Sequence, residues 1–249
     1  MKKVQFNGGQ RRTYGDNEAP IRFPRVPYEK AEVIKDVPPL EVHPAFADKK
    51  YVVTSDLTEK ITGVTAEMCD WWWANMEKGY DIWAPGEHYG FDWLVPPCEV
   101  GYEGSVEVSY EFDPNDPIIL TRMGMQEYPF TECYEHCWMS SAPLGPLNTF
   151  LVHMYQDVPG GIYWRSVQFM TESDAEIMRA NKDKMPDLDS HMEYESGRLN
   201  AVLPVLYNLW KDHPDPWENV HFDLRTRKNP DGTWSHIAKN GKPTYNGIE

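Results

Sequence analysis

A histidine and a glutamate late in the chain have the spacing of a metal-binding pair. The outer residues of the run His191-Met-Glu-Tyr-Glu195 are four positions apart, which on a helix places both side chains on one face. An imidazole and a carboxylate in this arrangement could hold a divalent metal ion. Glu193 lies about 200° round the same helix, so we expect it to face solvent. The spacing alone is weak evidence, since His88 and Asp92 repeat it without a helical pattern.

A second histidine, His88, lies in a restricted stretch of backbone. It ends the run Tyr80-Asp-Ile-Trp83-Ala-Pro85-Gly-Glu-His88, in which aromatic residues and a proline follow a tryptophan-rich segment. Such restriction suits a metal ligand, whereas a structural histidine in a loop that enters a strand is the simpler alternative.

Cys133 and Cys137, with His136 between them, form a competing cluster of metal-binding residue types. The cluster lacks a second pair of closely spaced cysteines, and it lies where the pattern is extended or irregular. We therefore expect these cysteines to be ordinary packed residues.

The elements that would position these residues are a long helix and a set of strands before it. Apolar residues recur at helical spacing over 188–210, where Pro204 should bend the helix or start a new segment. Short alternating runs broken by Pro, Gly, Asn and Asp indicate an antiparallel sheet. A possible capping box covers Asp56 to Glu59. We expect strands over 105–112, 117–125, 150–156 and 162–170, helices over 65–78 and 173–181, and a last hairpin over 220–227 and 233–238.

This order of elements predicts an α+β fold in which a curved antiparallel sheet packs against a long C-terminal helix. A cavity between the sheet and the helix would suit a small aromatic guest. Residues 1–50 contain six prolines among charged residues and show no sustained period. We interpret them as an extended N-terminal arm along the body or along a second subunit, with a partly disordered leader as the alternative. Residues 51–249 would then form one domain.

Composition excludes several classes of function. The 249 residues are 41% hydrophobic and include ten Trp and fourteen Tyr, enough for a core and a ligand pocket. The net charge of −15 disfavours nucleic acid and anionic membranes as partners. Because no apolar run approaches a membrane span or a signal peptide, we expect a soluble, cytoplasmic protein whose four cysteines are reduced.

Several segments together carry a family resemblance over roughly residues 65–210. Asp70-Trp71-Trp72-Trp73 is followed by the run from Tyr80 to His88 described above. Leu151-Val152-His153 then precedes Gly160-Gly161 and Arg165-Ser166, and His191-x3-Glu195 precedes Leu203-Pro204. In this order, the segments resemble the 2,4-diacetylphloroglucinol hydrolase and phloretin hydrolase family.

This resemblance implies a zinc-dependent hydrolase that cleaves the carbon–carbon bond between an acyl group and a phloroglucinol-type ring. It also implies a homodimer and a helix-grip fold like that of Bet v 1-type plant allergens. Carried over by position, the metal ligands are His88, Glu111, His191 and Glu195.

The strand ligand has alternatives. Glu107 and Glu111 are four residues apart on one strand, so they share a face and differ only in depth within the cavity. Glu127 is a third candidate.

The ligand set also indicates the chemistry. Two imidazoles and two carboxylates suit Zn²⁺, and Mn²⁺, Fe²⁺ or Co²⁺ would also fit. Such an ion lowers the pKa of bound water to about 7 and polarises an aryl ketone for attack. The ring must then be protonated as it leaves. Tyr80 would hold or protonate a ring hydroxyl and His153 would shuttle the proton near neutrality. Their alternatives are simple packing for Tyr80 and a core histidine for His153.

We expect a small aromatic ketone as substrate, contacted by Trp83, Phe91 and Arg165. Phe91 stands where the family usually has a polar residue, and Val167-Gln168-Phe169 replaces the family's arginine and aromatic residues. The many aromatic residues near the metal motifs favour a phloretin-like substrate over diacetylphloroglucinol.

Two other functions fit the same cavity. One is a non-catalytic binding protein for a hydrophobic aromatic ligand, which has no need of converging metal ligands. The other is a metal-dependent lyase or cyclase that acts on a polyketide, which analysis of the products would distinguish.

Overall fold

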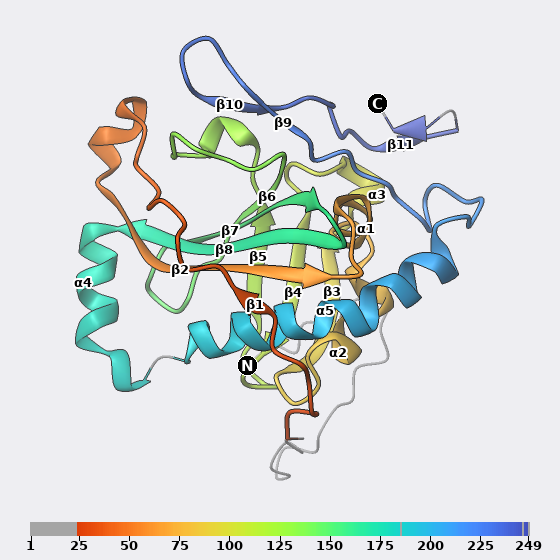
Figure 1. Cartoon of the computed structure of the whole chain (residues 1–249), viewed down its shortest axis with the longest axis horizontal. Helices are drawn as coiled ribbons and strands as arrows, with labels where there is room; N and C mark the ends of the chain where they lie inside the picture. The colour runs from red at the N-terminus through yellow and green to blue at the C-terminus, as the bar shows by residue number, and fades with distance from the viewer. Residues whose placement is uncertain (1–23, 185, 246, 249) are drawn as a thin grey trace.

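One eight-stranded sheet dominates the computed structural model, which describes residues 24–184, 186–245 and 247–248. The strand order is β1-β2-β8-β7-β6-β5-β4-β3, and every neighbouring pair is antiparallel (Figure 1). The strands are β1 (Glu32–Val33), β2 (Tyr51–Thr62), β3 (His88–Val95), β4 (Val106–Glu111), β5 (Ile118–Arg122), β6 (His136–Ser141), β7 (Thr149–Val158) and β8 (Gly161–Thr171).

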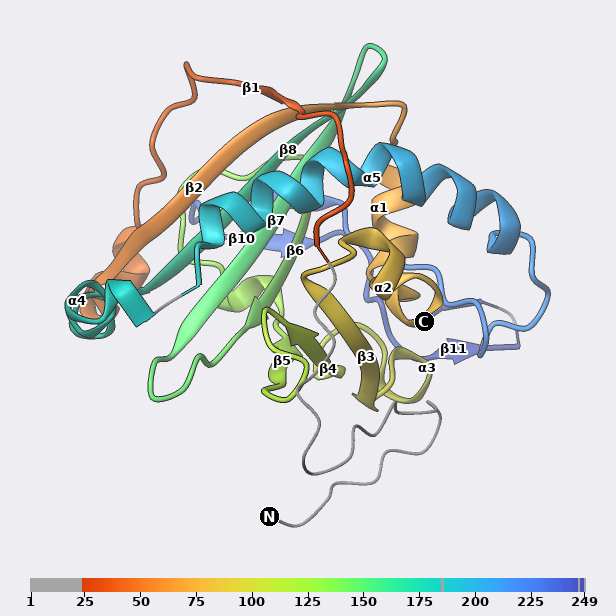
Figure 2. The same ribbon diagram turned by 90° about the horizontal axis from the view of Figure 1, so that it is seen from below.

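A long helix, α5 (Leu188–Trp210), crosses one face of this sheet (Figure 2). Its first turn is capped by the Asp187 side chain, which accepts a hydrogen bond from the backbone N–H of Ser190 at 3.2 Å. The other helices are α1 (Ala66–Trp72), α2 (Tyr80–Trp83), α3 (Pro97–Val100) and α4 (Glu172–Ala180). Short 3₁₀ turns are η1 (Pro44–Lys49), η2 (Met76–Lys78), η3 (Met125–Glu127) and η4 (Lys182–Lys184).

The α+β fold with a large antiparallel sheet and a C-terminal helix is as predicted, but Pro204 does not interrupt the helix. The helix extends from Leu188 to Trp210 with Pro204 inside it. The carbonyl of Pro204 accepts a hydrogen bond from the Asn208 side chain at 2.8 Å. Because proline has no backbone N–H, the helix continues here without a hydrogen bond from Pro204 to the carbonyl of Asn200.

Two other local predictions were wrong. The expected helix over 65–78 ends at Trp72, because the Asn75 side chain donates to the carbonyl of Trp71 at 2.7 Å and to that of Val220 at 2.7 Å. The expected capping box from Asp56 to Glu59 lies inside β2, where its residues pair with β8. In both places tertiary contacts outweigh the local pattern.

Both faces of the sheet are buried. The face under α5 carries a core that includes Trp71, Trp72 and Trp73, each 1% exposed. Trp73 stacks on Trp138 of β6 at a centroid distance of 4.4 Å. The opposite face carries a second core, which includes Met154 and Phe169 and partly buried residues such as Val42 and Trp234.

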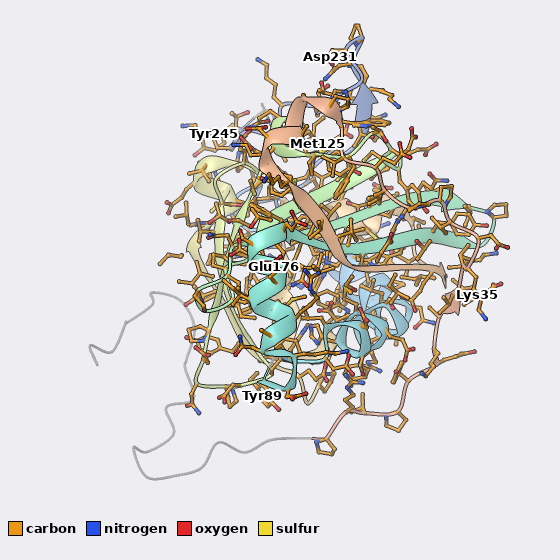
Figure 3. All side chains as sticks on the ribbon, turned by 90° about the vertical axis from the view of Figure 1, so that its left-hand side faces the viewer. Lys35, Tyr89, Met125, Glu176, Asp231 and Tyr245 are labelled. Carbon is orange, nitrogen blue, oxygen red and sulfur yellow. The ribbon has the colours of Figure 1, made fainter. Side chains whose placement is uncertain are left out.

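The remaining segments lie on these two layers. Strands β9 (Thr226–Lys228) and β10 (Trp234–His236) form a hairpin, whose exposed turn at Asp231 projects from the body (Figure 3). Strands β11 (Pro243–Thr244) and β12 (Gly247–Ile248) form a second small hairpin. In the described part of the predicted arm, β1 pairs with β2, while residues 1–23 lie outside the described residues. Among the helices of the described ranges, none combines the length and apolar character that a membrane crossing requires.

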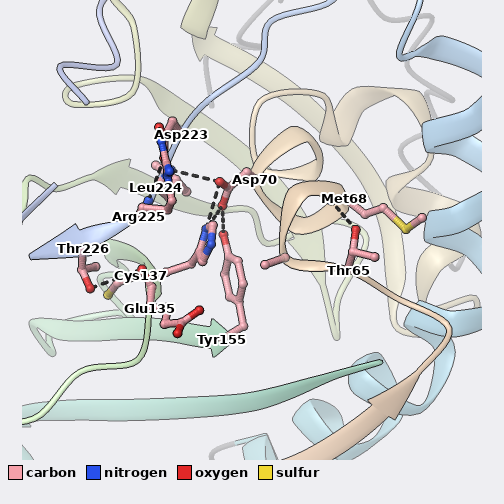
Figure 4. A network of polar contacts seen from close by, with 12 residues as sticks. Thr65, Met68, Asp70, Glu135, Cys137, Tyr155, Asp223, Leu224, Arg225 and Thr226 are labelled. Carbon is pink, nitrogen blue, oxygen red and sulfur yellow. Dashed lines mark hydrogen bonds and ion pairs between the residues drawn. The ribbon is translucent and has the colours of Figure 1, made fainter. Parts of the chain in front are cut away.

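A buried polar cluster joins α1 to the sheet and to the C-terminal segment (Figure 4). Asp70 accepts hydrogen bonds from the Tyr155 hydroxyl at 2.7 Å, from His136 Nδ1 at 3.0 Å and from the backbone N–H of Leu224 at 3.1 Å. We call these four residues the Asp70 cluster. It holds the segment after α5 against the body.

Candidate metal centre

Three sequence-distant segments bring four acidic and imidazole side chains together. The pairing of β3 with β4 places His88 directly opposite Glu111. Helix α5 supplies His191 and Glu195, one turn apart, from the facing layer. Ligand atoms of His88, Glu111 and His191 all lie within 4.8 Å of one another, and within the described ranges this is the one group of its kind that could hold a metal ion.

Glu195 completes this arrangement. Its Oε1 lies 2.9 Å from His88 Nε2 and 3.5 Å from His191 Nε2. His191 Nε2 also lies 3.6 Å from Glu111 Oε2. The four side chains are between 0% and 16% exposed, so they face one another inside the protein. The side chains of the four predicted ligands thus lie next to one another, with Glu195 against both imidazoles.

The donors and acceptors of this group do not match one another. His88 Nδ1 lies 3.1 Å from the carbonyl oxygen of Tyr80, which can only accept, so Nδ1 carries a proton. In neutral His88 the lone pair of Nε2 then faces the carboxylate of Glu195, and Nε2 has no hydrogen-bond partner within the described chain. Two facing lone pairs repel each other, whereas a cation between them would bind both. The buried donor set therefore fits a divalent metal ion.

His191 has the same arrangement. Its Nδ1 lies 2.6 Å from Glu87 Oε2, so the N–H at this position donates to a carboxylate. In neutral His191 the Nε2 lone pair then points toward Glu111 and Glu195. A carboxylate behind a ligand histidine is a common feature of metal sites, because it fixes the tautomer and orientation of the ring.

The electrostatic field at this point favours positive charge. Burial alone would lower the pKa of His191, but Glu195, Glu87 and Glu111 outweigh it and raise that pKa to about 10. Burial likewise opposes the charge of Glu195, yet His191 and His88 hold its pKa well below the usual range. Since protons and metal ions compete for the same lone pairs, a group that attracts one also attracts the other.

Tyr80 lies against two of these residues. Its ring stacks on His88 at a centroid distance of 4.0 Å, and its hydroxyl donates to Glu111 Oε1. Burial and the nearby carboxylate of Glu111 raise the pKa of Tyr80 well above its usual value, so it remains a protonated phenol and a hydrogen-bond donor.

An aromatic cavity is lined by Glu111, His191 and Glu195 and is bounded by the sheet, α2, α5 and the segment after α1. It is partly enclosed, and its wall is mostly apolar with a few polar groups. Its lining residues are Trp73, Met76, Tyr80, Trp83, Glu107, Glu111, Leu120, Trp138, Leu151, His153, Gln168, Leu188, His191, Met192 and Glu195.

His153 lines this cavity, but its ionisation differs from the sequence-based expectation. Its ring lies among Trp73, Trp138 and Trp164 at centroid distances of 5.0 to 5.2 Å, and Nδ1 lies 2.9 Å from Ser166 Oγ. Burial lowers the pKa of His153 to about 4. The imidazole is therefore neutral at pH 7, and a shuttle that relies on the ordinary pKa near neutrality does not fit this position.

The predicted substrate contacts divide into three cases. Trp83 lines the cavity, and its Nε1 donates to the carbonyl of Glu195 at 2.9 Å. Phe91 packs against Tyr80 at 5.0 Å and is not part of the cavity wall, so it supports Tyr80 from behind. Arg165 points from the other face of β8 and pairs with Asp56 at 2.6 Å, so a substrate contact by Arg165 does not fit the structure.

The alternatives for the strand ligand are separated by register. Glu107 lies opposite Trp93 rather than His88, and its carboxylate is paired with the buried guanidinium of Arg122. It lines the cavity without joining the four-residue group. Glu127 is exposed on η3 and lies outside the cavity.

The competing cysteine cluster is not a metal site within the described ranges. His136 belongs to the Asp70 cluster, and Cys133 and Cys137 are free thiols.

Sequence reasoning missed one residue of this site, Glu87, whose carboxylate lies behind His191. Its position directly before His88 is the one local signal that could have indicated it.

Comparison with known proteins finds one distant curated relative, the phloretin hydrolase of Eubacterium ramulus. The two sequences are 23% identical over 196 residues, which cover 62% of this chain and 67% of the relative. No protein-family model matches the sequence. At this distance, the relative suggests a hydrolase-like function.

Two solved structures are also similar to this chain. Protein Ms6760 of Mycobacterium smegmatis has a TM-score of 0.41 and 14% identity, and covers 69% of this chain and 96% of its own. A protein from Rhodobacter sphaeroides has a TM-score of 0.36 and 15% identity, with coverages of 63% and 99%.

Proposed function

We propose that this protein is a metal-dependent hydrolase that cleaves the carbon–carbon bond between an acyl group and a phloroglucinol-type ring. The observation that carries the proposal is the convergence of His88, Glu111, His191 and Glu195 beside an aromatic cavity. The distant similarity to a phloretin hydrolase supports the choice of hydrolysis and of a phloretin-like substrate. A helix-grip arrangement of the sheet around α5, similar to that of Bet v 1, belongs to the same proposal.

Zinc is the proposed ion, held by the two imidazole Nε2 atoms and the two carboxylates. When bound there, it would supply Lewis-acid polarisation of a carbonyl group and a lower pKa for water. The surrounding rings of Trp73, Trp83 and Trp138 would exclude bulk water and contact an aromatic substrate. The reaction consumes one water, whose oxygen joins the acyl carbon while the ring carbon takes a proton.

Tyr80 is the proposed donor to the oxygen atoms of the substrate. Its hydroxyl is buried, protonated and already directed into the group of ligands through Glu111. A ring hydroxyl or ketone oxygen in the cavity could replace Glu111 as its acceptor.

His153 is the second proposed hydrogen-bond donor to the substrate. Trp164 Nε1 donates to Ser166 Oγ at 2.8 Å, which leaves the serine proton for His153 Nδ1 at 2.9 Å. This chain favours the tautomer with a proton on Nε2. A neutral imidazole of this kind can donate a hydrogen bond from Nε2 to a ring oxygen, while the ring carbon takes its proton from water.

Elemental analysis combined with a phloretin assay tests the proposal. We expect about one zinc per purified chain, and release of phloroglucinol together with 3-(4-hydroxyphenyl)propanoic acid. Removal of zinc with a chelator should stop the release, and added zinc should restore it. Quenching of tryptophan fluorescence by phloretin without any product would favour the binding-protein alternative. Other products from the metal-loaded protein would favour a lyase or cyclase.

A further inference from the structure

The first described residues pack tightly on the helix that carries two of the proposed ligands. We define residues 24–30 as the N-terminal strap. The ring of Tyr28 contacts the ring of Tyr194 edge-on, at a centroid distance of 4.8 Å. A Cβ atom on Gly197 would lie only 2.6 Å from the ring of Tyr28. The absence of a side chain at Gly197 therefore allows the strap to lie this close to α5.

Arg25 is the strap residue nearest the metal centre. Its Nε donates to Glu87 Oε1 at 2.6 Å, and its Nη1 and Nη2 donate to the hydroxyl and carbonyl of Ser190 at 3.0 and 3.2 Å. Its guanidinium also lies over the ring of Tyr194, 4.8 Å from the centroid. Ser190 directly precedes the proposed ligand His191, so Arg25 contacts both α5 and the carboxylate behind that ligand.

Glu87 connects Arg25 to His191 through its two oxygen atoms. Oε1 accepts from Arg25, whereas Oε2 lies 2.6 Å from His191 Nδ1. With its Nδ1 proton donated to Glu87, His191 keeps the Nε2 lone pair for a metal ion. The guanidinium of Arg25 holds the Glu87 carboxylate in the position from which it accepts the hydrogen bond of His191 Nδ1.

We propose that Arg25 is a positioning residue, which acts through Glu87 to hold His191 in the tautomer and orientation that bind the metal. The N-terminal strap thereby sets the affinity of the metal centre. This inference rests on the proposed metal centre, but it concerns residues that neither the sequence pattern nor the comparisons indicate.

The test measures the apparent Kd of the full chain for Zn²⁺ by competition with a chelator of known affinity. Glu87→Gln removes the charge behind His191 and should weaken zinc binding about 10- to 100-fold. Arg25→Met should weaken it about two- to fivefold, because the pair with Glu87 is partly exposed. Arg25→Lys keeps the charge and should recover part of this loss.

Lys30→Met is the matched control. Lys30 joins the same strap to the same helix by an ion pair with Glu193 at 2.6 Å. Glu193 also accepts from the Tyr28 hydroxyl and lies about 200° round the helix from His191. We expect the zinc affinity of Lys30→Met to be unchanged. Equal weakening by Lys30→Met and Arg25→Met would mean that the strap merely holds the helix, and would overturn the proposal.

The double variant tests whether Arg25 acts through Glu87. In the Glu87→Gln background, Arg25→Met should cause no further loss of zinc affinity. The same loss in both backgrounds would overturn the proposed route. If the unchanged protein binds zinc and Arg25→Met binds it with the same Kd, only the proposed role of the strap is overturned. No zinc uptake by the unchanged protein would overturn the metal centre as well.

Discussion

Two buried clusters in this molecule contain the same residue types but differ in whether their hydrogen-bond donors and acceptors match. The Asp70 cluster and the metal centre each combine carboxylate, imidazole and tyrosine side chains. At Asp70, a hydroxyl, an imidazole N–H and a backbone N–H all donate to one carboxylate. At the metal centre, the Nδ1–H groups of both imidazoles donate outward, so that in the neutral rings the Nε2 lone pairs face two carboxylates. In the first cluster every contact pairs a donor with an acceptor, whereas in the second the unprotonated ring nitrogens and the carboxylates are all acceptors.

The match between donors and acceptors separates structural from functional polar clusters in a protein core. Buried polar groups with matched donors and acceptors stabilise the fold and need nothing else. A group whose acceptors face one another costs free energy unless a cation compensates it. The positions of the two clusters agree with this distinction, since residues of the metal centre line the aromatic cavity and Asp70 does not.

The largest effect is expected for His191→Ala. Loss of one imidazole removes a ligand and leaves the carboxylates facing a gap, so bound metal and phloretin turnover should both fall below detection. His136→Ala, the matched change in the Asp70 cluster, should keep its metal. Elemental analysis and phloroglucinol release measure both variants. Full metal occupancy in His191→Ala would contradict the assignment of the site.

The second-largest effect is expected at Tyr80, which is compared with Tyr155 because each hydroxyl donates to a carboxylate. Tyr80→Phe should keep its metal but lose about 10²- to 10⁴-fold in turnover, as expected for loss of a proton donor. Tyr155→Phe should keep its turnover and lose about 1 to 2 kcal/mol of folding stability. Steady-state kinetics and urea unfolding of both variants give the comparison. Unchanged turnover in Tyr80→Phe would exclude its catalytic role.

The local part of the site could be predicted from sequence, because helical spacing alone puts His191 and Glu195 on one face. The strand ligand could not be fixed in this way. Glu107 and Glu111 share a face, and only the register of β4 against β3 shows that Glu111 lies opposite His88. That register shifts between His88 and Gly90 and again between Trp93 and Val95, which no periodicity in the sequence reveals.

Arg165 and Glu87 show two other limits of sequence reasoning. Strand β8 is buried along most of its length on both faces, so its pattern does not tell which face lines the cavity. The side chain of Arg165 consequently could not be placed. Glu87 gains its role from Arg25, which is 62 residues away, and from His191, which is 104 residues away. Such contacts arise only when the layers pack.

Asp70→Asn should affect stability rather than metal content. The neutral amide accepts weaker hydrogen bonds, and its NH₂ group faces donors, so unfolding should require about 3 to 5 kcal/mol less free energy. Zinc affinity per folded chain should stay unchanged, because the cluster does not contact the cavity. Urea unfolding without metal and chelator competition measure the two quantities. A selective loss of zinc affinity would remove the distinction between the clusters.

Glu59 shares features of both clusters, since only one of its carboxylate oxygens is paired within the described chain. Its substitution should change folding stability less than Asp70→Asn does, and this effect depends on pH. Glu59 is 0% exposed on β2; one oxygen accepts from the Ser196 hydroxyl, and the other has no hydrogen-bond partner among the described residues. Burial raises the pKa of Glu59 from 4.5 to about 7. Because the folded state then holds the proton more tightly than the unfolded state, its carboxylate destabilises the fold increasingly as pH rises from about 4.5 to 7.

Glu59→Gln should remove this penalty. The variant should match the unchanged protein near pH 4.5 and be more stable by up to about 3 kcal/mol at pH 8. Glu29→Gln, the same change at an exposed position, should alter stability by less than about 0.5 kcal/mol at both pH values. Urea unfolding at pH 4.5, 6 and 8 measures all three proteins. If the difference in unfolding free energy between Glu59→Gln and the unchanged protein is the same at every pH, the charge of Glu59 is compensated in the fold. An oxygen without a hydrogen-bond partner would then not by itself mark an incomplete cluster.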